Sequence, residues 1–301
     1  MTTTLPDFFC TDLARSSEEQ IAGSAAALTT LWLALEVPEN WGNKALPESN
    51  LPAAVKDRLR TWEKTTPGAR LQLIKQGAGL AADKIHFFVA LADDDDPRLY
   101  RLLLQDYNDL LSLDLDALLR RDPVFDAQRW VEPIFLVCTN GKRDRCCAKW
   151  GLPLYRHMAA AAPGQVWQTT HIGGHRFAPT LVCLPESVTY GWLDLEDAAP
   201  LVQAHRVGNL YRLDRYRGRS TYAAPVQAAE AFLRAETGVL ALDAYRFVGH
   251  SGDDTACTVE FVTSDGGLRH RVELEIYLSD FANPNSCGKA EGEPARQYRR
   301  G

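Results

Sequence analysis

The chain has 301 residues, of which 46% are hydrophobic and 24% are charged, and this ordinary globular composition argues against global disorder. Its formal net charge of −6 provides no bulk attraction for nucleic acids or anionic membranes, so we predict neither as a partner. The seven cysteines are an odd number in a chain of 33.5 kDa, which does not fit a disulfide scaffold and points to metal ligation instead.

The N-terminal stretch carries no targeting signal that we recognise. Residues 1–7 lack both the basic region and the apolar region of a signal peptide. The longest apolar run, at residues 28–37, is about half of what a membrane-spanning helix needs, and it contains Glu36. The sequence therefore predicts a cytoplasmic protein.

The first part of the chain alternates between strand and helix patterns. Residues 84–92 show this most clearly, because Ile85, Phe87 and Val89 recur with the period of two that is typical of a strand. The acidic run at residues 93–96 is interpreted as a solvated loop. The predicted strands are 28–37, 70–75, 84–92 and 98–105, and the predicted helices are 52–64 and 106–121.

Asp122-Pro123 interrupts this pattern, and we place a domain boundary there, with an N-terminal α/β domain at residues 1–127 and a second domain at 128–301. The alternation then resumes, and residues from 283 onward are expected to be extended. The predicted strands are 134–137, 166–170, 180–184, 187–193, 245–249, 256–263 and 269–278, and the predicted helices are 148–162, 197–205 and 223–237.

Cysteines and histidines that could share a metal lie at the ends of these elements. Cys138 ends a predicted strand, and Cys146-Cys147 opens the next helix, where the helix N-terminus and nearby basic residues favour the ionised thiolate. His171 and His175 follow the next strand and are separated by Ile-Gly-Gly, and this glycine pair favours a tight loop over a regular helix. Thiolate and imidazole ligands together suit either zinc or iron–sulfur chemistry.

Zinc is the main alternative to an iron–sulfur cluster. Zinc fingers use closely spaced cysteines, then about twelve residues, then a histidine pair. Here eight residues separate Cys138 from Cys147, and 23 residues separate Cys147 from His171. This spacing fits a finger poorly.

The sequence around these residues resembles a known family. The segments FLVCTNGKRDRCCAKWGLP and HIGGHRFAPTLVCLPESVTYGWLDLEDAAPLV, and the terminal NSCGK, are similar to the sucrase/ferredoxin-like family. The resemblance is densest over residues 132–205. In thioredoxin-like 2Fe–2S ferredoxins a cysteine loop precedes a Pro, an apolar strand, another Pro, a Tyr-Gly pair and an Asp that starts a helix. The corresponding residues here are Pro179, Leu181–Leu184, Pro185, Tyr190-Gly191 and Asp197.

This resemblance implies an α/β fold in which residues 128–301 form a thioredoxin-like ferredoxin domain with a β-rich C-terminal extension. The N-terminal α/β domain could be a degenerate thioredoxin-like copy. The resemblance also implies a 2Fe–2S cluster with Cys138 and Cys147 on one iron and His171 and His175 on the other. Cys146 is the alternative to Cys147.

The expected function is that of an iron–sulfur protein acting in electron transfer or redox sensing, with a redox partner protein as its reductase or acceptor. Neutral imidazoles in place of two thiolates should raise the reduction potential above that of all-cysteine ferredoxins. A zinc-stabilised interaction module and a redox enzyme of unknown substrate are the alternatives. The sequence contains no Cys-x-x-Cys, P-loop or G-x-G-x-x-G motif that would indicate a disulfide oxidoreductase or a nucleotide site.

Overall fold

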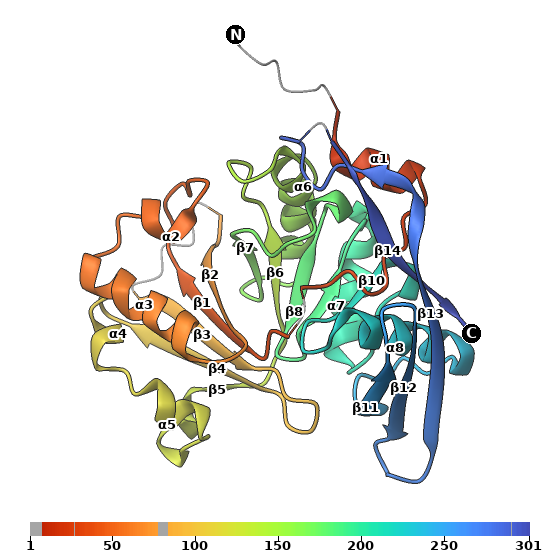
Figure 1. Cartoon of the computed structure of the whole chain (residues 1–301). Helices are drawn as coiled ribbons and strands as arrows, with labels where there is room; N and C mark the ends of the chain where they lie inside the picture. Colours follow the sequence, from red (N-terminus) through yellow and green to blue (C-terminus); the bar gives the residue numbers. More distant parts are fainter. Residues whose placement is uncertain (1–7, 27, 78–83, 290) are drawn as a thin grey trace.

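The structure is a computed structural model that describes residues 8–26, 28–77, 84–289 and 291–301. It confirms the predicted α/β class, with a ten-stranded mixed sheet and a four-stranded antiparallel sheet. In Figure 1 the large sheet curls through the molecule, and the small sheet lies beside its C-terminal half. Residues 1–7, where the sequence predicts no signal peptide, lie outside the described part of the chain. Of the helices in that part, none combines the length and apolar character needed to cross a membrane.

The first half of the large sheet follows the predicted alternation closely. Apolar side chains from its strands form a core against α3, which contributes Val55, Leu59 and Trp62 from one face, at a spacing of three to four residues. The elements are α1 (Cys10–Ser16), β1 (Leu31–Glu36), α2 (Ala45–Glu48), α3 (Ala53–Thr65), β2 (Ala69–Lys75), β3 (Ile85–Leu91), β4 (Arg98–Leu104), α4 (Asp109–Ser112), α5 (Leu115–Leu119), η1 (Pro123–Gln128) and β5 (Arg129–Trp130).

The single helix predicted at residues 106–121 is wrong, because two short helices, α4 and α5, occupy this segment. Leu113 has an extended backbone between them. Asp114 then caps the second helix, and its Oδ1 accepts a hydrogen bond from the backbone N–H of Ala117 at 2.9 Å. A capping side chain inside an apolar pattern therefore starts a new helix instead of extending the old one.

The second half of the large sheet repeats the order of the first. In each half a strand, a helix and a second strand form a parallel pair of strands. A third strand then pairs antiparallel with the first, and a fourth pairs antiparallel with the third. The order is β1–α3–β2–β3–β4 in the first half and β6–α6–β7–β8–β9 in the second. The elements are β6 (Ile134–Cys138), α6 (Arg145–Ala161), β7 (Val166–Thr169), η2 (His175–Phe177), β8 (Leu181–Leu184), β9 (Val188–Tyr190), η3 (Leu195–Asp197), α7 (Ala198–Arg206), η4 (Leu213–Arg215) and β10 (Tyr216–Arg219).

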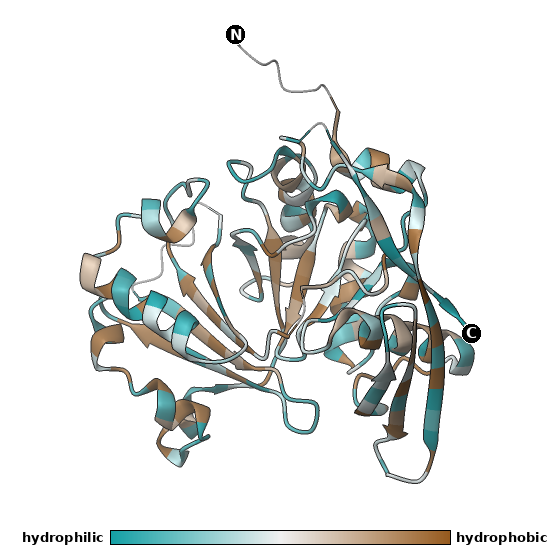
Figure 2. Cartoon of the chain, in the orientation of Figure 1, coloured by the Kyte–Doolittle hydropathy of each residue, from teal (hydrophilic) through white to brown (hydrophobic). Residues whose placement is uncertain are grey.

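The two halves join edge to edge within one sheet. Strand β2 pairs antiparallel with β7, with Ile74 opposite Thr169 and Lys75 opposite Gln168. Strand β5 lies just after the predicted boundary at residue 127, yet it pairs with β4 of the first half. In Figure 2 the strands of both halves are largely brown and the connecting loops largely teal or pale, as expected for a sheet with a hydrophobic core on each face. The division into two domains at this position stays a prediction.

The C-terminal region consists of α8 (Ala224–Thr237) and the antiparallel strands β11 (Tyr245–Gly252), β12 (Ala256–Thr263), β13 (Arg269–Asn283) and β14 (Glu293–Arg300). The tail predicted as extended forms β14, which pairs with β13, and β13 runs five residues beyond the predicted end at residue 278. Strand β10 is absent from the prediction because its residues, Tyr-Arg-Gly-Arg, show no apolar alternation.

A buried histidine in the second half should make stability depend on pH. His205 in α7 lies with its Nε2 3.0 Å from the hydroxyl of Tyr190, and burial, followed by the charge of Arg219, lowers its pKa to about 3. The unfolded chain takes up a proton below about pH 6.5, while the folded chain does not. Stability is therefore complete above that pH and is lost as the pH falls from about 6.5 towards 3, at up to about 1.4 kcal/mol per pH unit.

We expect urea unfolding of the His205→Gln variant to show a weaker loss of stability between pH 7 and pH 5 than the wild type shows. Measuring the unfolding free energy of both proteins at these two pH values checks this. Equal losses in both would mean that His205 does not cause the dependence.

Candidate metal centre

Two of the predicted ligands lie at one edge of the large sheet. Strands β6 and β7 are parallel, and Cys138, the last residue of β6, lies opposite Thr169, the last residue of β7. The carboxyl ends of both strands therefore meet, and His171 follows β7 by two residues. The side chain of Cys138 is almost completely buried, whereas His171 is half-buried.

Cys147 reaches the same place from the first turn of α6. Asp144 caps this helix, with Oδ1 accepting a hydrogen bond from the backbone N–H of Cys146 at 2.9 Å. The helix packs tightly against the end of β6 at Gly151, where an added Cβ would lie 2.0 Å from the carbonyl oxygen of Cys138. Any larger residue at position 151 would push the helix, and Cys147 with it, away from the sheet.

The structure brings Cys138, Cys147 and His171 together. The Nδ1 atom of His171 lies 4.0 Å from the sulfur of Cys138 and 3.9 Å from the sulfur of Cys147. One ligand atom from each of the three residues lies within 4.8 Å of the others. The hydrogen bond from Cys147, together with His171, holds the pKa of Cys138 well below its usual range despite burial. The contact therefore favours the thiolate, the form of cysteine that binds metals, at Cys138, while it raises the pKa of Cys147.

His175 lies beside this group of three but is not part of it. Its ring centroid is 4.8 Å from that of His171, and its Nε2 lies 3.7 Å from Oδ2 of Asp144. Its Nδ1 is buried and has no hydrogen-bond partner among the described residues. Burial, reinforced by His171 and opposed by Asp144, lowers the pKa of His175 and favours the neutral imidazole. A neutral ring with an unpartnered buried nitrogen fits the donor set of a metal site.

The loop between the two histidines has the tight geometry that its glycines predict. Gly173 and Gly174 have φ values of +94° and +71°, in the left-handed region that glycine adopts at little cost. An added Cβ at Gly174 would lie 2.1 Å from a guanidinium nitrogen of Arg217. A side chain at position 174 would therefore displace that arginine.

Arg217 and Arg70 are site residues that the sequence analysis missed. Arg217 is fully buried and donates a hydrogen bond to the carbonyl oxygen of Gly173 at 3.2 Å. Arg70 approaches the carbonyl oxygen of His171 at 3.4 Å. Burial, and then the charges of Arg176 and Arg70, lower the pKa of Arg217 to about 9, so this side chain carries a positive charge at neutral pH. Two cationic side chains therefore hold the histidine loop, a field that favours added negative charge.

Basic side chains near the thiols and the histidine loop contact residues of the N-terminal segment. Arg176 pairs with Glu19 at 2.6 Å, Lys149 lies 3.6 Å from the ring centroid of Phe9, and Arg145 donates a hydrogen bond to the carbonyl oxygen of Phe8. These contacts attach the N-terminal segment to α6 and to the histidine loop.

The remaining cysteines separate into two groups. All seven are free of disulfides. Cys183 and Cys257 are buried in hydrophobic cores. Cys146 does not face Cys138, because its sulfur contacts those of Cys10 and Cys287 instead. The helix therefore directs Cys147, and not Cys146, towards the predicted centre.

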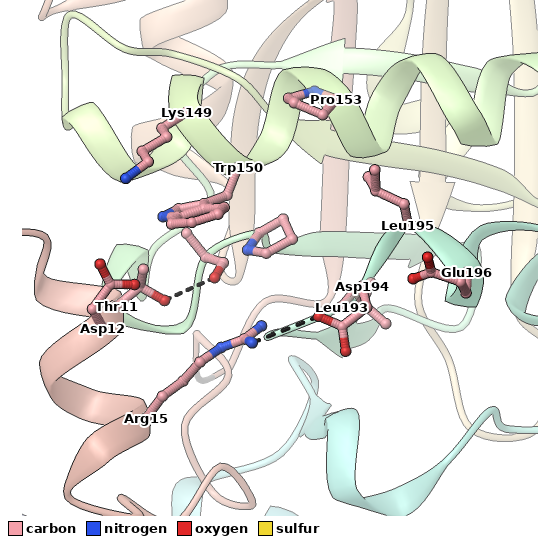
Figure 3. A pocket seen from close by; sticks show the side chains of 12 residues that line it. Thr11, Asp12, Arg15, Lys149, Trp150, Pro153, Leu193, Asp194, Leu195 and Glu196 are labelled. Atoms are coloured by element: carbon pink, nitrogen blue, oxygen red, sulfur yellow. Dashed lines mark hydrogen bonds and ion pairs between the residues drawn. The ribbon is translucent and has the colours of Figure 1, made fainter.

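A separate pocket of about 470 Å³ lies beside α1 and α6 (Figure 3). Trp150 forms part of its wall, and Arg15 crosses it to Asp194, with 3.6 Å between Nη1 and Oδ1. None of the four predicted ligands lines this pocket. The candidate metal centre is thus separate from this pocket.

Fold and site together define an α/β protein with a buried group of thiol and imidazole side chains that could hold a metal. The model of the sucrase/ferredoxin-like family matches residues 21–218, about two thirds of the chain. The chain therefore belongs to this family. It is also similar to altered inheritance of mitochondria protein 32 from Meyerozyma guilliermondii, with 31% identity over 104 residues. This match covers 31% of the present chain and 37% of that relative, well below two thirds of its length.

Proposed function

We propose that the protein carries a 2Fe–2S cluster and acts in electron transfer or redox sensing, with Cys138, Cys147, His171 and His175 as ligands. The observation that carries the proposal is the meeting of two buried thiols with the ring of His171, beside a second ring whose buried Nδ1 has no hydrogen-bond partner in the described part of the chain. The word ferredoxin in the family description supports the same chemistry. We also propose that residues 128–301 contain a thioredoxin-like domain, supported by the order of β6, α6, β7, β8, β9 and α7.

When bound, the cluster would accept and release one electron. The protein side chains would set how readily this happens. Burial of both cysteines excludes water from the sulfurs, while the positive charges of Arg70 and Arg217 favour the more negative reduced state. Of the three residues that lie together, Cys138, Cys147 and His171, the half-buried His171 is the most exposed to solvent. We propose that a redox partner protein docks over the histidine loop.

The test is the composition of protein purified without oxygen. We expect a coloured protein with about two irons and two acid-labile sulfides per chain. A colourless preparation without iron, even after reconstitution with iron and sulfide, would overturn the proposal.

Zinc is the second candidate, and one observation favours it. The Nδ1 of His171 is within 4.0 Å of both sulfurs, a spacing that suits three ligands around a single ion. A zinc-stabilised interaction module would be colourless, and its zinc would be lost in the Cys138→Ser variant. The metal that Cys138→Ser loses relative to the wild type, iron or zinc, therefore separates the two candidates.

Replacing His175 with cysteine should keep a cluster but lower its reduction potential. A thiolate adds a negative charge that a neutral imidazole does not have, so we expect the potential to fall by roughly 100 mV or more. Redox titration of the wild type and of His175→Cys measures the difference. An unchanged potential together with an unchanged spectrum would show that residue 175 is not a ligand.

A further inference from the structure

A second group of sulfur atoms lies near the proposed centre and shares none of its ligands. The sulfur of Cys146 is 3.4 Å from that of Cys10 and 3.2 Å from that of Cys287, and the triangle closes at 3.6 Å between Cys10 and Cys287. The three residues come from the start of α1, the first turn of α6 and the turn before β14. Each is at most 2% exposed. This group is called the thiol triangle below.

The dimensions of the thiol triangle suit one metal ion. Zinc binds thiolate sulfur at about 2.3 Å, so two sulfurs at a tetrahedral angle lie about 3.8 Å apart. The observed sulfur–sulfur distances, 3.2 to 3.6 Å, fall slightly below that value. They are far longer than the 2.05 Å or so of a disulfide bond. Little movement would therefore open the triangle around an ion.

Asp144 provides a fourth donor. One of its carboxylate oxygens lies within 4.8 Å of all three sulfurs. Its Oδ2 accepts hydrogen bonds from the hydroxyl of Ser286 and the backbone N–H of Cys287, each at 3.0 Å. Its Oδ1 accepts only the hydrogen bond from the N–H of Cys146 among the described contacts, which leaves room for a further partner on that oxygen.

We propose that Cys10, Cys146, Cys287 and Asp144 form a second metal site, which binds one structural zinc ion. Three soft sulfur ligands and one carboxylate in a closed, fully buried arrangement are typical of structural zinc and leave no open position for catalysis. The compact triangle has space for one ion and not for a multinuclear cluster, whose cysteines ligate separate irons. Binding would displace thiol protons to solvent and would involve no oxidation or reduction.

The proposed ion would fasten both ends of the chain to α6. Cys10 and Cys287 lie 277 positions apart in the sequence, and a clip that closes so long a loop restricts the unfolded chain strongly. Apolar side chains from Phe8, Phe9 and Trp150 cover the thiol triangle, as expected for a closed site. In Figure 1, α1 and the C-terminal strands lie close together near α6. The ion would thus stabilise the N-terminal segment and the turn before β14.

The test is the zinc content of full-length variants. We expect about one zinc per chain in the wild type, in Cys138→Ser and in the control Cys257→Ser, and less than about a tenth of that in Cys10→Ser and Cys287→Ser. Retention of zinc by Cys10→Ser and Cys287→Ser would overturn the proposal. Loss of zinc in Cys138→Ser alone would assign the ion to the first centre and would also overturn it. The outcome does not depend on iron, so failure of this proposal and failure of the proposed cluster are distinguishable.

A second measurement uses the wild-type protein and requires no folded variant. Removing zinc with a chelator should make Cys10, Cys146 and Cys287 more than tenfold more reactive towards an alkylating reagent, with Cys183 as the unaffected control, because bound thiolates are protected. Peptide mass spectrometry identifies the modified cysteines. Absence of zinc after incubation with Zn²⁺, or a disulfide within the thiol triangle in the purified protein, would contradict the proposal.

Discussion

We expect the Cys138→Ser variant to retain less than about a tenth of the iron and visible absorbance of the wild type. A serine hydroxyl is a hard and poorly ionised ligand at neutral pH, and iron–sulfur clusters require soft thiolates. Cys138 is buried at the end of β6, so no other group can readily replace it. Iron and sulfide content after anaerobic purification, together with the visible spectrum, measure the effect.

Two matched variants make this result specific. The Cys257→Ser control places the same change in the separate C-terminal sheet and should keep full iron content. The adjacent cysteines provide a second comparison. The Cys146→Ser variant should keep its iron, whereas the Cys147→Ser variant should lose it. Equal iron in Cys138→Ser and the wild type would exclude Cys138 as a ligand.

The contrast between Cys146 and Cys147 shows where sequence reasoning reached its limit. The proximity of Cys138 to His171 could be predicted, because parallel neighbouring strands end at the same sheet edge. The directions in which the side chains of Cys146 and Cys147 point could not be predicted. Successive residues of a helix point about 100° apart, and the predicted helix began at residue 148, three residues after the actual start at Arg145. With the helix start misplaced, the rotation that separates these two sulfurs was undetermined.

Longer-range features of the site had no local signal. Strands β1 to β4 and helix α3 of the first half were predicted within a few residues because their apolar periodicity is local. The pairing of β2 with β7, the burial of Arg217 below the histidine loop and the meeting of Cys10 with Cys287 each join residues far apart in the chain. Such contacts are decided by tertiary packing, which neither residue type nor spacing records.

A buried ionic network in the second half provides the largest expected effect on stability. Glu230 of α8 accepts hydrogen bonds through Oε1 from Arg219 of β10 and from Arg234 of α8, each at 3.0 Å, and through Oε2 from the hydroxyl of Tyr216 at 2.6 Å. Burial alone would raise the pKa of Glu230, but Arg219 and Arg234 outweigh it and hold that pKa below its usual value. The carboxylate therefore stays ionised at neutral pH and offsets part of the positive charge of two buried cations.

The Glu230→Gln variant should lose roughly 3–5 kcal/mol of unfolding free energy at pH 7, a large part of a typical total of about 5–15 kcal/mol. The amide has nearly the same shape, but it removes the charged partner that Arg219 and Arg234 share in the interior. The control is Glu236→Gln in the same helix, where the pair with Arg300 is 46% and 36% exposed and its loss should cost less than about 1 kcal/mol. Urea unfolding followed by circular dichroism measures both variants. Similar small losses in the two would show that the network stabilises the fold no more than a surface ion pair does.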